Sequence, residues 1–533
     1  MCHGFIRQNC NPYFLPKQWK TRGHSVIDSR RGTRQISNRQ FSGALVSKKL
    51  NNKLDNLDQV FPETFTPDQR AHAKTMLLQR LSLAAHRFYG GKMQTVPRVG
   101  AFGFNWFNVW YTPGVSAVSR AIRDDNDASF DFSNRGNLVA IVSDSTRVLG
   151  DGNCSPAGGL GVMEGKAFLM KYLGGVDAVA LCMDSRNAQG EHDPAAIIEF
   201  VKRLQPSFGA VNLEDISQPN CYRVLDQLRE ACNIPVWHDD AQGTGCVTLA
   251  GLINALKVAD KDIAKARMVF YGAGASNTTI VSLIMQAGAD PANIVMFDSR
   301  DSLGRHRADV QADPRFYRKW EICEKTNPSD IRDMEKAMTG ADVLIALSKP
   351  GPDVIKPEWV RKMAKKGLVF ACANPVPEIY PHTAKEAGAY IVATGRGDFP
   401  NQVNNSVGFP GILKGALLVR AKKITDAMAI TAARSLAAFA EKQGIHPDYI
   451  IPTMDEADVF PQEAADVAMQ AIADGVARAP ATREAIYERA RADIAASRRM
   501  HDQLIASGFI PPPPQALLDA ALTETVAEIK KQK

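Results

Sequence analysis

Residues 268–277, MVFYGAGASN, join an apolar run to a glycine turn, and a helical pattern follows as far as Gln286. An acid, Asp298, closes the next apolar run. This order of strand, glycine turn, helix, strand and acid is typical of a dinucleotide-binding unit, where glycines let the backbone approach a pyrophosphate and the acid accepts ribose hydroxyls. A purely structural turn is the alternative, since G-x-G alone is a weak signal. We predict a cofactor site formed by Gly272, Gly274, Ala275, Ser276 and Asp298.

Two features near the turn concern how the cofactor binds and which cofactor it is. Asn277 occupies a position where a small residue normally allows the helix to pack closely on the strand. The larger side chain is expected to affect the affinity for the cofactor or the pose in which the cofactor binds. Asp298 favours NAD, whereas Arg300 and Arg305 would suit the 2′-phosphate of NADP. We expect NAD rather than NADP.

Alternating apolar runs and amphipathic stretches extend in both directions from the turn, which predicts parallel sheets covered by helices. We expect an α/β protein with a smaller N-terminal catalytic domain (51–257), a doubly wound Rossmann-like domain (258–480) and a C-terminal helical extension (481–533). A predicted helix at 248–258 marks the first boundary. The expected strands are 138–142, 178–182 and 210–213 in the first domain, and 268–271, 294–297, 343–347, 368–373 and 390–393 in the second.

Composition narrows the class of protein. The 533 residues are 45% hydrophobic and 23% charged, which is typical of a folded chain. The longest apolar stretches carry charges, so we expect no membrane span. Nine scattered cysteines without a C-x-x-C pair indicate free thiols in a reducing compartment.

The net charge of +7 originates at the N-terminus, where residues 1–50 hold ten Lys or Arg and a single acid, Asp28, for a local charge of +9. The rest of the chain is nearly neutral, so we expect no nucleic-acid partner. Residues 1–50 have the composition of a transit peptide, with a disordered tail or an unused upstream start as the alternatives. We therefore expect a cytoplasmic protein, or one of the mitochondrial matrix if this segment is a transit peptide.

Two acidic pairs each follow an apolar run in the first domain. Glu214 and Asp215 end one run, and Asp239 and Asp240 end the next. Carboxylates at the ends of parallel strands would repel one another unless a cation lies between them, and oxygen ligands suit Mg²⁺ or Mn²⁺. Capping of the following helices is the alternative.

Several longer motifs occur in the order found in malic enzymes. They span about residues 105–460 and comprise WYTPGV (110–115), VMEGKA (162–167), NLEDI (212–216), HDDAQGT (238–244), the glycine turn, ANP (373–375), NN (404–405) and FPG (409–411). The chain therefore resembles the malic enzyme family. The resemblance implies oxidative decarboxylation of L-malate to pyruvate and CO₂ with NAD or NADP and Mg²⁺ or Mn²⁺, in a homo-oligomer that is a dimer or tetramer.

The resemblance also assigns roles to residues. It implies that Tyr111 is the general acid and Lys166 the general base, although Lys166 can act as a base near neutral pH only if its pKa is lowered. The metal ligands would be Glu214, Asp215 and Asp240, with Asp239 beside them. The residues that hold malate would be Arg147, Asn374 and Asn405, and Asn374 would also face the nicotinamide. Taken singly, the tyrosine and the lysine would be a turn residue and a solvated helix residue.

One departure from the family pattern bears on the substrate. Asp151 lies where the family has a small or apolar residue, and its charge would repel a dianion. Two alternatives therefore stay open: a malolactic or oxaloacetate-decarboxylating enzyme on the same fold, and a catalytically weak dinucleotide-binding regulatory protein.

Overall fold

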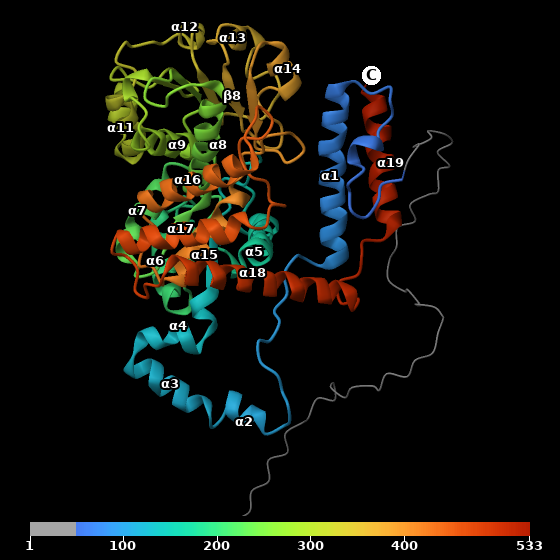
Figure 1. The fold of residues 1–533 in the computed structure, drawn as a ribbon, viewed down its shortest axis with the longest axis vertical. Coiled ribbons are helices and arrows are strands. Elements are labelled where there is room, and N and C mark those ends of the chain that lie inside the picture. Colours follow the sequence, from blue (N-terminus) through green and yellow to red (C-terminus); the bar gives the residue numbers. More distant parts are fainter. Residues whose placement is uncertain (1–48, 533) are drawn as a thin grey trace, which may run out of the picture.

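Two parallel sheets form the centre of the molecule (Figure 1). The computed structural model describes residues 49–532, so the predicted basic tail lies almost wholly outside the described residues. The first sheet has the order β2-β1-β3-β4 and the second the order β6-β5-β7-β8-β9. The strands are β1 (Leu138–Ser143), β2 (Asp177–Cys182), β3 (Ala210–Leu213), β4 (Val236–His238), β5 (Met268–Tyr271), β6 (Ile294–Phe297), β7 (Val343–Ala346), β8 (Leu368–Ala371) and β9 (Ile391–Thr394).

Helices cover both faces of the first sheet, because its central strand is apolar on both sides. Val139 and Ile141 of β1 point into one buried cluster, and Ala140 and Val142 into another. The first face is covered by α5 (Leu160–Gly174), and the second by α6 (Pro194–Leu204) and α7 (Asn220–Ala231). None of the six residues of the edge strand β2 is fully buried.

The second sheet is doubly wound about β5, which pairs in parallel with β6 on one side and β7 on the other. This point of reversal is where α/β folds bind ligands. The helices of this part of the chain are α9 (Ala275–Gln286), α10 (Ala308–Gln311), α11 (Tyr317–Lys325), α12 (Met334–Met338), α13 (Pro357–Arg361) and α14 (Pro381–Glu386).

Helices near the end of the chain return to the first sheet and join the two halves. They are α15 (Phe409–Leu418), α16 (Asp426–Gln443), α17 (Val459–Ala473) and α18 (Arg483–Ala506). Ser497 of α18 donates a hydrogen bond to the carbonyl of Lys171 at the end of α5, and α16 packs on α8 (Thr244–Ala259). One buried cluster runs through both sheets, so the halves share a core.

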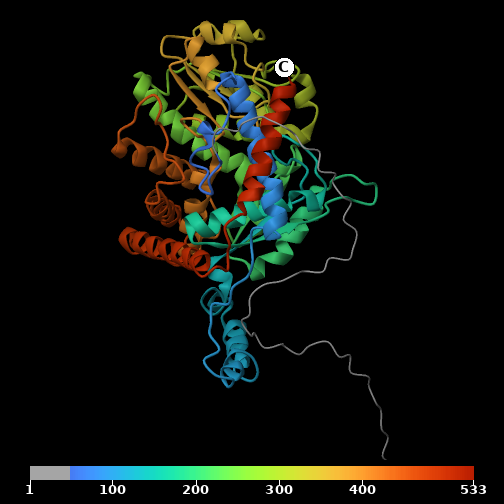
Figure 2. The same cartoon turned by 90° about the vertical axis from the view of Figure 1, so that its right-hand side faces the viewer.

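Two further parts lie outside these layers. We call residues 49–92 and 515–531 the strap, which contains α1 (Pro67–Tyr89) and α19 (Gln515–Lys531). These helices lie side by side in both views (Figures 1 and 2), and their apolar residues form a separate core. We call residues 99–125 the arm, which contains α2 (Trp106–Trp110) and α3 (Val115–Asp124) and projects from the body. α4 (Ser129–Phe132) connects it to β1.

The predicted fold class is confirmed, and the expected strands agree with the structure to within a residue or two at most ends. The predicted helix at 248–258 begins earlier, at Thr244, directly after a π-helical turn at Asp239–Gly243. Within the described residues, no helix combines the length and apolarity needed to cross a membrane.

Candidate active site

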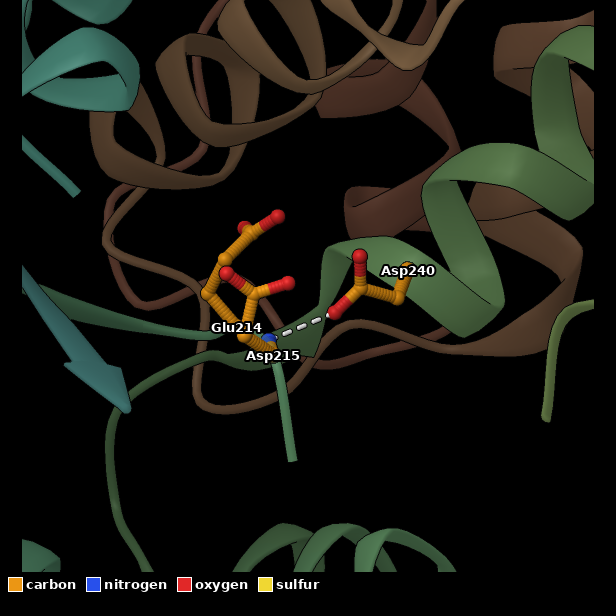
Figure 3. A group of neighbouring side chains, drawn as sticks. All are labelled: Glu214, Asp215 and Asp240. Carbon is orange, nitrogen blue, oxygen red and sulfur yellow. Dashed lines mark hydrogen bonds between the residues drawn. The ribbon is translucent and has the colours of Figure 1, made fainter. Parts of the chain in front are cut away.

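Three carboxylates predicted as metal ligands lie together at the carboxyl edge of the first sheet (Figure 3). Glu214 and Asp215 directly follow β3, and Asp240 lies in the turn that follows β4. One carboxylate oxygen of each lies within 4.8 Å of the others. The backbone N–H of Asp215 donates to Asp240 Oδ2 at 2.6 Å, and this contact fixes one loop against the other.

The turn after β4 needs a glycine at its end. A Cβ on Gly243 would lie 2.0 Å from Asp239 Oδ1, so any side chain there would displace that carboxylate. Trp237 Nε1 donates to the same Asp239 oxygen at 3.1 Å. The tight turn thus holds Asp239 inward beside the three predicted ligands.

Burial and mutual repulsion oppose ionisation of this acidic cluster. Burial raises the pKa of Glu214 well above its usual range, and burial together with Asp240 raises the pKa of Asp215 to about 8. Asp215 Oδ2 is buried without a hydrogen-bond partner. An all-oxygen set with an unpartnered buried oxygen and excess negative charge fits a hard divalent cation such as Mg²⁺ or Mn²⁺.

Lys166, the predicted general base, reaches this cluster from α5. Its Nζ contacts Asp239, lies 3.1 Å from Glu214 Oε1 and stands 4.6 Å from the centre of the Phe409 ring. Burial lowers the pKa of Lys166, but Asp239, Glu214 and Asp240 outweigh burial and raise it. In this arrangement the ammonium stays protonated, the opposite of the lowered pKa that a general base requires.

The residues predicted to hold malate lie on loops around the same edge. The backbone N–H of Arg147 donates to the Asp215 carbonyl at 3.0 Å, and the Arg147 side chain is exposed. A Cβ on Gly150 would lie 2.6 Å from the Asn374 carbonyl oxygen, and one on Gly243 would lie 3.3 Å from Asn405 Cβ. Loops of both halves therefore meet here, with Asn405 against the turn of the acidic cluster and Asn374 against the loop that follows Arg147.

The glycine turn faces the acidic cluster. Gly272 has φ of 98°, and a Cβ there would lie 2.4 Å from the Leu347 carbonyl oxygen. A Cβ on Gly274 would meet nothing within 4 Å, which leaves room for a ligand before α9 begins at Ala275. Ser276 Oγ donates to the Asp240 carbonyl at 2.7 Å, so the predicted cofactor and metal segments touch.

Asp298 closes β6 as predicted, but its carboxylate already has partners. Arg307 Nη2 donates to Asp298 Oδ2 at 2.9 Å, and Lys319 Nζ lies 3.6 Å from the same oxygen. Burial would raise the pKa of Asp298, but Arg307 and the N–H groups of Arg300 and Asp301 outweigh burial and lower it. The Asp298 carboxylate is therefore ionised and can accept hydrogen bonds from hydroxyl groups.

Tyr111, the predicted general acid, is not among these residues. It follows α2 on the arm and is 73% exposed. Its backbone N–H donates to the Phe107 carbonyl within the arm. The structure of one chain therefore brings Lys166 and the carboxylates together, with the two asparagines on neighbouring loops, but it leaves Tyr111 at the end of α2. The arm that contains α2 projects from the body (Figure 2).

Comparisons with known proteins agree with this geometry. Residues 104–229 match the family described as malic enzyme, N-terminal domain, and residues 241–472 match malic enzyme, NAD binding domain. The chain belongs to the malic enzyme family. A solved malic enzyme of Entamoeba histolytica is 62% identical with a TM-score of 0.89, over 90% of this chain and 99% of that one.

Two curated relatives carry related names. A bifunctional malic/malolactic enzyme of Bacillus subtilis is 40% identical over 78% of this malic enzyme and 98% of its own length. An NAD-dependent malic enzyme of Geobacillus stearothermophilus is 39% identical over 73% and 78% respectively.

The two unusual residues of this malic enzyme have different surroundings. Asn277 is fully buried, and its Nδ2 donates to the Gly272 carbonyl at 2.8 Å, so it ties the helix to the glycine turn by a hydrogen bond. Asp151 is exposed on the loop beyond Arg147. Sequence reasoning missed Arg307 as the partner of Asp298, and it found Phe409 only as part of a motif, without its contact with Lys166.

Proposed function

We propose the following division of labour for the oxidative decarboxylation of L-malate to pyruvate and CO₂, the activity that malic enzyme membership gives this chain. Glu214, Asp215 and Asp240 hold the divalent cation, and Gly272, Gly274, Ala275, Ser276 and Asp298 hold the dinucleotide. The observation that supports this most directly is the buried contact of Lys166 with Asp239 and Glu214 beside an unpartnered Asp215 oxygen.

Malate lies between Lys166 and the asparagines in this proposal. Arg147 binds one substrate carboxylate in bidentate fashion, and Asn374 and Asn405 donate to malate oxygens. Lys166 takes the proton of the C2 hydroxyl, which requires that a cation bound among the carboxylates offset the negative charge that keeps the ammonium protonated. Tyr111 returns a proton to C3 after CO₂ leaves. When bound, the cation supplies positive charge that offsets the carboxylates and polarises the C2 oxygen, and the oxidised nicotinamide supplies the hydride acceptor.

Tyr111 reaches the reacting carbon from a second copy of the chain. None of the residues of α2 or α3 is buried, and the exposed apolar side chains of the arm are Val99, Phe102, Phe104, Trp106, Phe107, Val109, Trp110, Val115 and Val118. Exposed apolar patches of this extent mark protein interfaces. The arm therefore docks on a partner, and the malic enzyme is a homo-oligomer built on a dimer.

The face that receives the arm surrounds the helix of Lys166. Leu160 and Phe168 on α5 and Val179 on the edge strand β2 are 42%, 37% and 40% exposed, and Leu149 beside the site is 56% exposed. In a twofold dimer each arm would cover this face of the other subunit, and each site would combine Lys166 of one chain with Tyr111 of its partner.

NAD is the preferred cofactor in this proposal, because Asp298 is ionised and suited to ribose hydroxyls. Arg307 and Lys319 lie beside Asp298, and they are the residues that would bind the 2′-phosphate if the protein preferred NADP.

The test is reduced-nicotinamide formation by the purified protein with L-malate and Mn²⁺, run with NAD and NADP in parallel and with a chelator control. We expect chelator-sensitive reduction, faster with NAD, and an equal amount of pyruvate. A folded protein that binds dinucleotide but shows no metal-dependent turnover would overturn the proposal in favour of a regulatory binding protein.

A malolactic activity is the second candidate, because the Bacillus subtilis relative is named a bifunctional malic/malolactic enzyme. It would convert malate to lactate and CO₂ with the reduced cofactor reused on pyruvate. Lactate is measured in the same reaction, and its formation without net reduced cofactor would favour this candidate.

A further inference from the structure

We propose that Arg396 is a positioning residue for malate, held in place by Thr75 of the strap. This inference rests on the proposed function, since it concerns the Asn374 side of the malate site. Arg396 lies two residues after Thr394, the last residue of β9. Helix α1, which carries Thr75, lies outside both stretches that match the family descriptions.

The Arg396 guanidinium joins three segments. Nη1 donates to the Pro375 carbonyl at 2.8 Å and to Thr75 Oγ1, while Nε and Nη2 donate to the two oxygens of Asp398 at 2.8 and 2.6 Å. The Arg396 side chain is only 7% exposed. A planar, paired guanidinium in this position fixes the geometry of what it binds more rigidly than a single-point contact would.

The loop that carries Arg396 contacts both asparagine segments of the malate site. A Cβ on Gly395 would lie 2.8 Å from Asn374 Nδ2, so the Asn374 amide rests directly against this backbone. Asn404 Nδ2 donates to the Gly395 carbonyl at 3.2 Å, immediately before Asn405. A shift of this loop would therefore move both asparagines relative to the carboxylates.

The strap holds the outer side of the loop. Lys74 Nζ lies 4.0 Å from Asp398 Oδ2 and 2.8 Å from Asp58 Oδ1, and its side chain is 10% exposed. At the other end of α1, the backbone N–H of Lys92 donates to Glu164 Oε2 at 2.8 Å, two residues before Lys166. The strap thus contacts the asparagine loop and the lysine helix at once.

Two variants test the contact from both sides, with a third as a control. Arg396→Lys keeps the charge but loses the paired geometry, and Thr75→Val removes only the hydroxyl. Thr523→Val is the matched control, because Thr523 is an exposed residue of α19 whose hydroxyl contacts its own helix. Kinetics use L-malate, Mn²⁺ and the preferred cofactor, with a melting curve for each protein.

The expected result is a selective loss of malate affinity. Arg396→Lys should raise the KM for malate about tenfold, and Thr75→Val should raise it about threefold to fivefold. The KM for the cofactor should change less than about twofold in both. L-malate titrated against enzyme, Mn²⁺ and reduced cofactor, a mixture without turnover, should show the same loss by fluorescence.

Two results would overturn the inference. One is an unchanged malate KM in both variants, and the other is a parallel change of malate KM, cofactor KM and melting temperature, which indicates structural support alone. If Arg396→Lys does not fold, Thr75→Val decides. A wild-type protein that fails to oxidise malate would instead overturn the proposed function.

Discussion

Mixing two inactive variants should restore activity if Tyr111 and Lys166 of each site come from different chains. Tyr111→Phe lacks the proposed acid and Lys166→Ala the proposed base, and each alone should lose roughly 10²-fold to 10⁴-fold in pyruvate formation. In a mixed dimer, one site combines the intact Lys166 of the first variant with the intact Tyr111 of the second. The other site carries both defects.

The size of the recovery follows from this arrangement. With equal amounts and random pairing, half of the dimers are mixed and each has one intact site of two, so about one quarter of wild-type activity should return. The assay is reduced-cofactor formation after co-expression with two affinity tags, which allows the mixed dimer to be purified. The purified mixed dimer should reach about half of wild-type activity.

The inverse mixture is the control. A chain with both substitutions, paired with wild type, should give a mixed dimer without an intact site when the residues come from different chains. When they come from the same chain, that dimer would keep half of wild-type activity. No recovery in the first mixture, together with half activity in the second, would refute the exchange of Tyr111 between subunits.

The remaining predictions concern the metal, the turn and the cofactor. Asp240→Asn should raise the Mn²⁺ concentration for half-maximal activity at least about tenfold, measured by Mn²⁺ titration, because a carboxylate ligand is lost; an unchanged requirement would remove Asp240 from the ligand set. Gly243→Ala should destabilise the fold by about 1–3 kcal/mol in denaturant unfolding, because the new Cβ would meet Asp239 Oδ1 at 2.0 Å; a stability equal to wild type would show that the turn relaxes freely. Asp298→Asn should lower kcat/KM with NAD more than with NADP, and an equal loss with both would contradict its contact with the ribose.

The sequence predicted most of the fold because its signals are local. The strands around Gly272 and the acidic pairs at Glu214 and Asp240 are short runs whose pattern and order define the sheets and their active edge. The start of α8 was misplaced because the π-helical turn before it has no propensity signal and depends on the inward-facing Asp239.

Other parts of the site could not be read from the sequence. The electrostatic state of Lys166 depends on three carboxylates from two strand ends, and no local pattern gives their distances. The contact of Arg396 with Thr75 joins residues 321 positions apart. The exposure of the arm's aromatic side chains was also not predictable, because it depends on which other elements the arm packs against, and no local pattern gives this.

The pairing of α1 with α19 also determines when the protein can finish folding. The apolar face of α1, including Leu77 and Leu81, is covered by Leu518, Leu522 and Val526 of the last helix. At ordinary rates of synthesis, on the order of a minute passes between the emergence of the two helices. During that interval both sheets are synthesised and can fold, while α1 stays uncovered and open to chaperones. A chain terminated before Gln515 would thus contain both family domains and still lack the partner of its first long helix.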